Sequence, residues 1–505
     1  MALLGIDVGT TGIKATITDN DGEYISSAYR EYPTHSPRSG WFELDPDEVW
    51  EKAKIVIKNA ARKCGEKIIS VSSSSLGESF VMLDKKGKVL SNSMLYTDTR
   101  GSSETSELIE KLTSQRIMEK TGLKPALVFS LPKLMWIKKN RPELYDKIDK
   151  IIPFGGFILY KLGGPIATDI TLGLRTMALN TNSKKWDEEI IEASGIDADI
   201  FPEIHETGTI IGHVSQFASN ELGLSTDIQI VAGAHDQIMC AIGSGILHPG
   251  EALDGMGSVD NISPIFQYND RVVEMATNNY ATVSYLNGLY TTYAYVNDGG
   301  TLLRWYRDNL GESENIVSKY LGISVYDIFN DYCSQKPTNI LILPHFSGSA
   351  MPYMDSFSKG AILGMDLGTN KQKLYRAILE GISYEVRVNI ENLEAYGVPI
   401  DRLRASGGGS RSDIWLQIKS DILNKEIDAV ENIEAGTMGV IITAGVAAGT
   451  FDSYESAMKK LIKIRRVFKP NKNYHEQYNE NFERYKKIYE MQKNILKKPK
   501  LVAGG

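Results

Sequence analysis

Four short segments combine acidic, hydroxyl and small residues in patterns that suit phosphate chemistry. The first occupies residues 7–14 and reads Asp-Val-Gly-Thr-Thr-Gly-Ile-Lys. Asp7, at a strand end, could hold a hydrated Mg²⁺ ion, because this ion needs only one or two protein oxygens. The glycines let backbone N–H groups and the hydroxyls of Thr10 and Thr11 approach phosphate oxygens, and Lys14 could reach the same charge. The alternative is a plain hairpin with a turn aspartate.

The second and third segments are glycine-rich turns. Gly257 and Ser258 lie in a turn at residues 255–258, and two facing turns of this kind can clamp a triphosphate between two domains. Residues 406–413 read Ser-Gly-Gly-Gly-Ser-Arg-Ser-Asp and precede an amphipathic helix. A glycine run there, which includes Gly408, allows a flat group or a phosphate close to the helix N-terminus. The alternatives are an ordinary turn and a tight loop capped by Ser412 or Asp413.

The fourth segment, residues 233–237, ends a predicted strand in small residues and then presents Asp236. Its carboxylate could accept a proton from a hydroxyl nucleophile during phosphoryl transfer. Asp236 could instead cap the following helix. We interpret the neighbouring His235 as a structural residue. The sequence contains neither the P-loop pattern GxxxxGK[ST] nor the dinucleotide-binding pattern GxGxxG, so an NAD-linked dehydrogenase is not favoured.

Length and charge exclude several classes of protein. The 505 residues carry 56 Lys plus Arg and 63 Asp plus Glu, a formal net charge of −7. At about 100–200 residues per domain, this length predicts two to four domains, or two large ones. The mild acidity argues against nucleic-acid binding, and three widely separated cysteines predict no disulfide framework or zinc site. Because the apolar runs are shorter than the ~20 residues of a membrane span and the N-terminus has no signal-peptide pattern, we expect a cytoplasmic protein without a membrane partner.

Strand and helix patterns alternate along the chain and predict an α/β fold. Strands are expected at 3–8, 13–18, 24–28 and 68–74, with a helix that starts at Pro46 after an Asp45 cap. Residues 251–266 repeat the opening strand–turn–strand pattern, so we expect two similar domains, 1–248 and 249–505. A hairpin is predicted around Asn287-Gly288. Residues 469–500 carry aromatic residues at helical spacing, which predicts a terminal helix packed on the protein rather than a basic membrane helix.

In this order and spacing, the four segments resemble the FGGY family of carbohydrate kinases, within the actin/hexokinase/Hsp70-like ATPase superfamily. The resemblance covers roughly residues 3–465 and includes further local matches. These are Tyr-Thr-Asp-Thr-Arg at 96–100, Pro-Lys-Leu-Met-Trp at 132–136, Thr-Asp-Ile-Thr at 168–171 with Arg-Thr at 175–176, Leu-Pro-His-Phe-Ser-Gly at 343–348 and Ala-Ile-Leu-Glu-Gly-Ile at 377–382. The resemblance implies an α/β fold of two RNase H-like domains, with ATP and a sugar in the cleft between them.

The resemblance also implies a role for each matching residue. Asp236 would be the catalytic base, and Asp7 would be the carboxylate linked to Mg²⁺. The ATP contacts would be Thr10, Thr11, Lys14, Gly257, Ser258, Gly300, Gly408 and Ser412. The sugar contacts would be Gly77, Glu78, Asp98, Asp236 and Gln237. Ser258 departs from the family pattern, which usually has Gly-Thr at this turn.

Other departures bear on the substrate. Xylulokinases typically show Met-His-Gly at positions 77–79 and glycerol kinases show Arg-Glu at 77–78, so Glu78 fits the second group while Gly77 lacks its Arg. Gln237 also fits glycerol kinases, but Val128 replaces a substrate-contacting Tyr of that group. Loss of both side chains would enlarge the sugar site. We therefore expect a pentulose such as xylulose as the substrate, with glycerol, a longer polyol or an aldonate as the alternative.

An alternative of another class is an actin-like or chaperone-like switch that uses ATP without phosphorylating a sugar. Such a switch would share the phosphate turns, so these turns cannot discriminate. Glu78, Asp98 and residues 233–237 favour the kinase, because they have no evident purpose in a polymer or a chaperone. The expected partners are ATP, Mg²⁺ and a small sugar or polyol, and a homodimer is left open.

Overall fold

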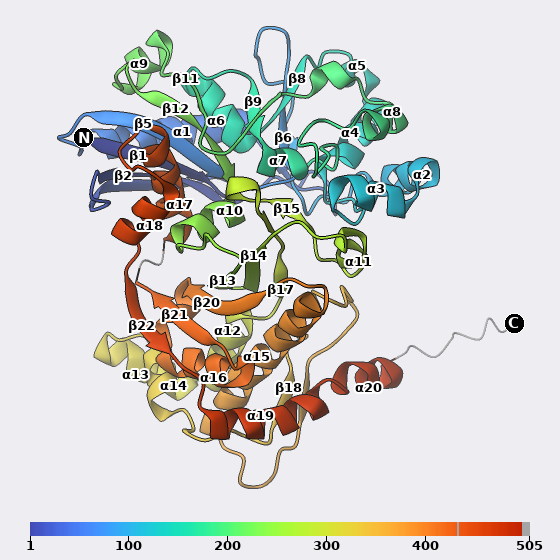
Figure 1. The fold of residues 1–505 in the computed structure, drawn as a ribbon, viewed down its shortest axis with the longest axis vertical. Coiled ribbons are helices and arrows are strands. Elements are labelled where there is room, and N and C mark those ends of the chain that lie inside the picture. The colour runs from blue at the N-terminus through green and yellow to red at the C-terminus, as the bar shows by residue number, and fades with distance from the viewer. Residues whose placement is uncertain (432–433, 497–505) are drawn as a thin grey trace, which may run out of the picture.

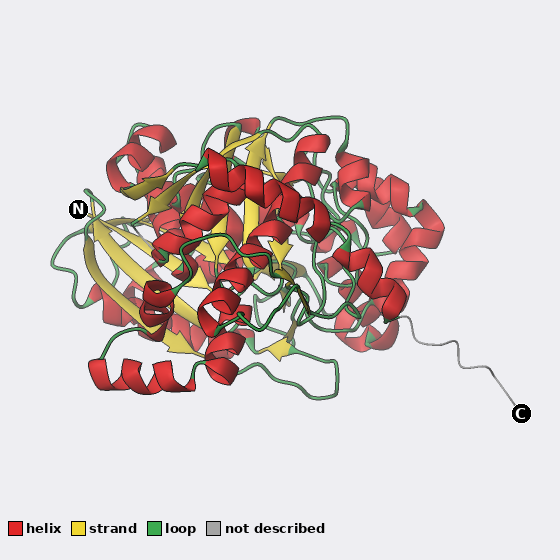
Figure 2. Cartoon of the chain, turned by 90° about the horizontal axis from the view of Figure 1, so that it is seen from below, coloured by secondary structure: helices red, strands yellow, loops and turns green. Residues whose placement is uncertain are grey.

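The structure is a computed structural model that describes residues 1–431 and 434–496. Two large mixed sheets lie one above the other along the longest axis of the molecule (Figure 1). Seen from below, helices lie above, below and to the right of the strands, and strands reach the left edge of the molecule (Figure 2). This arrangement confirms the predicted α/β class.

The first sheet has the strand order β11-β12-β5-β1-β2-β3. Its strands are β1 (Ala2–Val8), β2 (Gly12–Asp19), β3 (Tyr24–Glu31), β5 (Ile68–Ser75), β11 (Ile210–His213) and β12 (Gln229–His235). β1, β2 and β3 form the predicted antiparallel meander, whereas β5 runs parallel to β1 and β12 runs parallel to β5. β1 is buried along almost its whole length, which explains its nearly continuous apolar sequence.

The second sheet repeats this plan in the second half of the chain. Its order is β15-β16-β14-β13-β20-β21-β22, and β17 also pairs with β14. The strands are β13 (Gly250–Met256), β14 (Asp260–Phe266), β15 (Val283–Ser284), β16 (Tyr290–Thr291), β17 (Ala294–Val296), β20 (Ile400–Ser406), β21 (Glu426–Val430) and β22 (Ile464–Phe468). β13 and β14 are antiparallel, and β20 and β21 continue in parallel from β13 as β5 and β12 do from β1. The recurrence seen in the sequence is therefore a repeat of strand order.

Helices cover the sheets and also join them. α1 (Pro46–Ala61) begins after Asp45 as predicted, and the Asp45 side chain accepts a hydrogen bond from the Asp47 N–H at 2.9 Å. α1 packs on β2 and β3, and α6 (Phe154–Leu162) packs on β5 and β12. α17 (Ala435–Ala447) returns from the second half of the chain to cover β1 and β5, where it also packs against α10 (Asp236–Gly243) (Figure 1).

The remaining elements complete the two halves. The first half adds α2 (Ser102–Leu112), α3 (Ser114–Thr121), α4 (Ser130–Asn140), α5 (Pro142–Tyr145), α7 (Ile170–Leu174), α8 (Glu188–Ser194), α9 (Gln216–Leu222) and the paired strands β4 (Glu43–Leu44) with β7 (Ser93–Met94), β6 (Phe80–Leu83) with β8 (Lys150–Pro153) and β9 (Ala167–Asp169) with β10 (Glu203–His205). The second half adds α11 (Val272–Thr277), α12 (Gly300–Leu310), α13 (Glu312–Leu321), α14 (Val325–Tyr332), α15 (Lys371–Ala395), α16 (Asp413–Leu423), α18 (Tyr454–Leu461) and β18 (Leu341–Leu343) with β19 (Ala361–Leu363).

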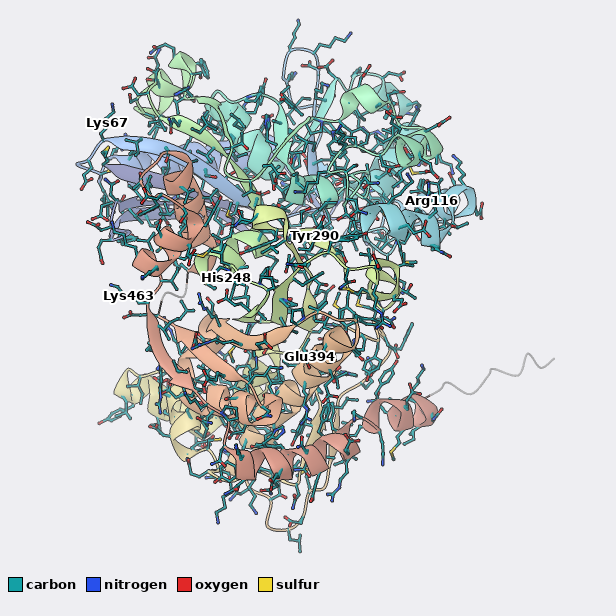
Figure 3. The ribbon with its side chains drawn as sticks, viewed as in Figure 1. Lys67, Arg116, His248, Tyr290, Glu394 and Lys463 are labelled. Atoms are coloured by element: carbon teal, nitrogen blue, oxygen red, sulfur yellow. The ribbon has the colours of Figure 1, made fainter. Side chains whose placement is uncertain are left out.

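The predicted hairpin around Asn287 is present, but its strands are short. β15 and β16 pair in antiparallel fashion, with Val283 opposite Thr291. The expected second strand then continues as β17, which pairs with β14 instead. Tyr290, labelled in Figure 3, lies between the two halves of the molecule, and its hydroxyl donates a hydrogen bond to the Thr181 carbonyl at 3.4 Å. This hairpin therefore connects the second sheet to the first half of the chain.

The predicted terminal helix consists of two helices, α19 (Lys472–Tyr485) and α20 (Ile488–Ile495), and residues 497–500 of that prediction lie outside the described residues. The aromatic side chains of Tyr478, Phe482 and Tyr485 are buried in the core around the second sheet. The prediction that this segment packs on the protein is confirmed. Within residues 1–431 and 434–496, no helix combines the length and the apolar character that crossing a membrane requires.

Candidate active site

Asp236 stands where the last parallel strand of the first sheet meets a helix. β12 ends at His235, and α10 begins with Asp236. The Asp236 side chain is 37% exposed, so a molecule from solvent can reach its carboxylate. The pKa of Asp236 is raised to about 7. The largest cause is desolvation at the C-terminal end of β12, and the charges of Asp7 and Glu78 add to it. A carboxyl group with this pKa can exchange a proton near neutral pH.

Asp7 lies in a row of polar residues across the first sheet. In the strand register it stands between Lys14 of β2 and Ser74 of β5. Ser74 Oγ donates a hydrogen bond to Asp7 Oδ1 at 2.6 Å. Lys14 forms an ion pair with Glu434, which directly precedes α17. Lys14 is therefore held at the contact between the first sheet and the returning helix.

The first tip, residues 9–12 between β1 and β2, carries Thr10 and Thr11. The Gly9 N–H donates a hydrogen bond to the Gly12 carbonyl at 2.9 Å and closes the turn. The Tyr32 hydroxyl donates to the carbonyls of both glycines. These bonds hold the carbonyls of Gly9 and Gly12 on the side of Tyr32.

The surroundings of Asp7 suit a hydrated divalent cation. Burial raises the pKa of Asp7, and the Ser74 hydrogen bond and the charge of Lys14 only partly oppose this rise. The charge of Asp7 in turn raises the pKa of Asp236. A bound cation would relieve both effects, because Mg²⁺ prefers carboxylate oxygens and water as ligands. Asp7 therefore fits the metal-linked role that we predicted for it.

The second tip, residues 257–259 between β13 and β14, carries Gly257 and Ser258. The Gly300 N–H donates to the Gly257 carbonyl at 2.9 Å, and the Thr301 N–H donates to the Ser258 carbonyl at 3.1 Å. Because α12 begins at Gly300, the N-terminus of this helix meets the tip. Helix N-termini attract anions, and Arg304 on the same helix donates to Ser258 Oγ at 3.1 Å. The structure thus brings three of the predicted ATP residues together.

Gly408 and Ser412 lie in the loop that precedes α16, beside the second tip. Gly407 has φ of 93°, and a Cβ atom there would lie 2.9 Å from the Met256 carbonyl oxygen, so the loop approaches β13 closely. Gly408 is exposed, with open space around it. Ser412 Oγ accepts a hydrogen bond from the Trp415 N–H at 3.3 Å. The helix cap that we considered for Ser412 is present, and it leaves Gly408 open to a flat ligand.

Gln237 links the two sheets next to Asp236. The Asn261 side-chain amide donates to Gln237 Oε1 at 3.0 Å and to Ser263 Oγ at 2.9 Å. Asn261 is the second residue of β14, which begins just after the second tip. This bond holds the start of α10, and with it the candidate base, close to the second tip.

Glu78 and Arg175 form an ion pair on the predicted sugar side. Arg175 Nε, at 2.6 Å, and one terminal nitrogen both donate to Glu78 Oε1. The side chains are 10% and 12% exposed, respectively. Glu78 has φ of 60°, a left-handed conformation that residues other than glycine rarely adopt, and Ser130 Oγ donates to its carbonyl at 2.9 Å. The Glu78 carboxylate is therefore held in one place.

The absence of a side chain at Gly77 leaves no hole in the structure. A Cβ atom at this position would lie 2.8 Å from the His235 ring and 3.0 Å from Arg175 Cγ. We expected the missing Arg to enlarge the sugar site. This expectation is wrong for Gly77, because the imidazole ring and the stem of Arg175 fill the space.

Asp98 holds the side chain of Arg100. Its fully buried carboxylate accepts hydrogen bonds from the Phe42 N–H and from Arg100, at distances of 2.6–2.9 Å. The Arg100 guanidinium carbon lies 4.0 Å from the centre of the Trp41 ring. Both carboxylate oxygens of Asp98 are thus used to hold Arg100, so its burial and bonding do not support the sugar contact that we predicted.

The sequence predictions omit two residues that belong to the site. Tyr96 is 41% exposed, and burial, followed by the charges of Glu78 and Asp236, raises the pKa of its phenol. Arg175 holds Glu78 by the ion pair described above. Both lie in segments that resemble family motifs, residues 96–100 and 175–176, and that placement is the signal that could have found them.

Comparisons with known proteins give the similarity of the chain as a whole. The model of the FGGY family of carbohydrate kinases, N-terminal domain, matches residues 2–243, and the model of its C-terminal domain matches residues 266–448. A glycerol kinase of Thermococcus onnurineus is 31% identical over 93% of this chain and 93% of its own. A xylulose kinase of Staphylococcus epidermidis is 28% identical over 98% of this chain and 97% of its own. The crystal structure of gluconate kinase from Lactobacillus acidophilus has a TM-score of 0.87 at 25% identity and covers 98% of each chain.

Proposed function

The chain belongs to the FGGY family of carbohydrate kinases, and we propose that it transfers the γ-phosphoryl group of Mg-ATP to a hydroxyl of a pentulose such as xylulose. As a family member it is a phosphotransferase that acts on a sugar hydroxyl, with the two-domain fold of solved family structures. The actin-like or chaperone-like switch is therefore not retained. The observation that carries the proposal is Asp236, an accessible carboxylate of raised pKa at the start of α10, which is tied to the second tip.

Asp236 acts as the base in the proposed mechanism. With a pKa near 7, its carboxylate accepts the proton of the sugar hydroxyl as the oxygen attacks the γ-phosphoryl group. The first and second tips hold the phosphate oxygens from two sides and align the reacting atoms, which is the main source of catalysis in phosphoryl transfer. Mg²⁺ bound near Asp7 would neutralise charge on the transferring phosphate.

The adenosine part of ATP is assigned to the segment around Gly408 and Ser412, and Gly300 supplies a further contact at the start of α12. Lys14 must exchange its partner Glu434 for a phosphate oxygen when ATP binds. The open space at Gly408 and the helix N-terminus at Gly300 support these assignments.

Two observations support a pentulose as the substrate. The similarity to a xylulose kinase extends over 98% of the chain, and Val128 stands where glycerol kinases carry a substrate-contacting Tyr. Glu78 and Gln237 lie close to Asp236 and would bind the other hydroxyls. Glycerol, a longer polyol or an aldonate is the second candidate. Glu78 and Gln237 fit the glycerol-kinase pattern, a glycerol kinase is 31% identical, and a gluconate kinase has a similar fold.

A coupled ADP-release assay over pentuloses, hexuloses, aldonates, glycerol and four-carbon polyols tests the proposal. We expect the highest kcat/KM with a pentulose. Asp236→Asn should lower kcat by about 10²–10⁴-fold, the usual contribution of a general base, while ATP binding changes little. Wild-type turnover in this variant would refute the role of Asp236, and a clear preference for glycerol would refute the pentulose assignment.

A further inference from the structure

His235 lies between the candidate base and a tyrosine from the second half of the chain. Its Nε2 atom is 3.3 Å from Asp236 Oδ1, and its Nδ1 atom is 3.3 Å from the Tyr293 hydroxyl oxygen. His235 and Tyr293 are each 6% exposed, so bulk water competes little for either contact. The backbone N–H of His235 donates a hydrogen bond to Thr171 Oγ1 at 2.8 Å, which holds the main chain at this point.

These surroundings determine the tautomer of His235. Burial and the charge of Arg175 keep the pKa of His235 well below its usual value, so the imidazole is neutral at pH 7 and carries one N–H. Burial also raises the pKa of Tyr293, which keeps its hydroxyl protonated. The deprotonated form of Asp236, which is the form that acts as a base, can only accept. In that form Nε2 carries the hydrogen and faces Asp236, while Nδ1 accepts from Tyr293.

We propose that His235 is a positioning residue for the base: its Nε2–H orients the Asp236 carboxylate toward the sugar hydroxyl, and Tyr293 holds the imidazole in the required tautomer. This inference rests on the proposed function and deepens it. It also replaces our interpretation of His235 from the sequence as a residue with a structural role alone.

Gly77 supports the assignment independently. A Cβ atom at this position would lie 2.8 Å from His235 Cδ2 and 2.9 Å from His235 Nε2. Any larger residue at 77 would push the imidazole away from Asp236. The absence of a side chain at Gly77 therefore leaves room for the His235 ring beside the Asp236 carboxylate.

Tyr293 makes the positioning depend on the arrangement of the two halves. It lies between β16 and β17 of the second sheet, whereas His235 ends β12 of the first sheet. The Tyr293 hydroxyl reaches Nδ1 only when the second sheet stands in its present place against the first. The base is therefore fully oriented only in this arrangement.

The test compares His235→Phe with His235→Gln. Phe keeps the ring and removes both nitrogens, so we expect kcat to fall about 10–100-fold while the KM for ATP changes less than about 2-fold. The acid limb of kcat/KM should move to higher pH, because the Asp236 carboxylate loses the N–H dipole 3.3 Å away that favours its charged form. Gln, which can place an N–H near the Nε2 position, should restore part of kcat and return the acid limb toward its original pH.

Tyr293→Phe tests the second contact by removing only the hydroxyl. We expect a smaller fall in kcat, about 3–10-fold, with the acid limb shifted in the same direction. Tyr285→Phe is the matched control, because Tyr285 is another buried tyrosine, and its hydroxyl donates to the Ile246 carbonyl at 2.6 Å. This control should keep the kcat and pH profile of the wild type.

The outcomes separate the inference from the proposed function. If His235→Phe is folded and keeps the kcat and pH profile of the wild type, His235 only packs and the inference is wrong. If His235→Phe fails to fold, Tyr293→Phe decides: an unchanged kcat and acid limb would overturn the inference. If the wild type phosphorylates a sugar but His235→Phe and His235→Gln behave alike, only this inference is contradicted. If the wild type is inactive on every sugar, the proposed function and this inference are both overturned.

Discussion

Asp236 combines the two properties that a general base needs, access and proton affinity. The charges of Asp7 and Glu78 add to desolvation and raise its pKa, while the Gln237 N–H and the charge of Arg175 oppose the rise. The balance is a pKa of about 7. An ordinary surface aspartate, with a pKa near 3.9, would be a proton acceptor about 10³-fold weaker. The carboxylates around Asp236 therefore make it a stronger proton acceptor.

The pH dependence of activity follows from this pKa. A raised pKa means that Asp236 is protonated at low pH and cannot accept the hydroxyl proton, so kcat/KM should fall about tenfold per unit below this pKa. The pKa is about 7 without a cation beside Asp7 and lower with one. The measurement is initial rates between pH 5.5 and 9 with the best sugar, with the coupling enzymes kept in excess at each pH. A plateau that extends down to pH 5 would show that burial and the neighbouring charges do not control the base.

Asp98 should be important for stability rather than for sugar contact. Asp98→Asn weakens one of two acidic partners of the buried Arg100, because Glu43 also pairs with Arg100 at 2.7 Å. We expect a loss of about 1–3 kcal/mol of unfolding free energy. Urea denaturation would measure this loss, and Asp146→Asn in an exposed turn is the control that should leave the midpoint unchanged. A variant that unfolds like the wild type but has a raised KM for the sugar would restore Asp98 as a substrate residue.

Three buried ionisable side chains on different elements connect the second tip to α16. Lys419 of α16 donates to Asp254 of β13 at 2.7 and 2.8 Å and to Asp260 of β14 at 2.6 Å, and all three side chains are fully buried. Asp254 and Asp260 lie on either side of the tip, and burial raises the pKa of Asp254. α16 begins at Asp413, directly after Ser412. The lysine therefore ties the second tip to the helix that follows Gly408 and Ser412.

Lys419→Met should separate these elements. Two buried carboxylates would lose their cation, which costs about 3–5 kcal/mol of unfolding free energy, and the loosened tip should raise the KM for ATP more than that for the sugar. Thermal melting and two-substrate kinetics measure the two effects. Lys469→Met removes an exposed ion pair and should change neither quantity. An unchanged KM for ATP in a folded Lys419→Met would show that the charges stabilise the fold without positioning the tip.

Local patterns predicted the elements that hold these groups, because turns, caps and alternating strands depend on neighbouring residues. The first three strands, the Asp45 cap and the hairpin tips are of this kind. The pairs Glu78–Arg175 and Lys419–Asp254 join residues far apart in the chain, so no local pattern reveals them. One signal was available, since Lys419 sits in the apolar run of α16. The pattern does not say which acidic residue it would meet.

At the scale of the whole molecule, the base depends on a helix from the other end of the chain. α10 carries Asp236 and packs against α17, which covers the first sheet although it follows β21 of the second. The backbones approach closely at two glycines: a Cβ atom at Gly243 would lie 1.8 Å from the Ala435 carbonyl oxygen, and one at Gly439 would lie 1.9 Å from the Met239 carbonyl oxygen. We propose a domain division at residues 248 and 249, with α17 packed across it.

Gly439→Ala should therefore disturb the base from a distance. The added methyl group must push α17 away from Met239, and overpacking of this kind typically costs about 1–3 kcal/mol. Because α10 begins at Asp236, we expect a lower melting temperature and at least a tenfold loss of kcat, since a misplacement of about 1 Å can cost 10²-fold. Gly436→Ala on the same helix is the control, because its Cβ would meet only Cys240 Sγ at 3.4 Å, an ordinary contact. If both variants melt and turn over alike, the close crossing of α10 and α17 does not hold the base in place.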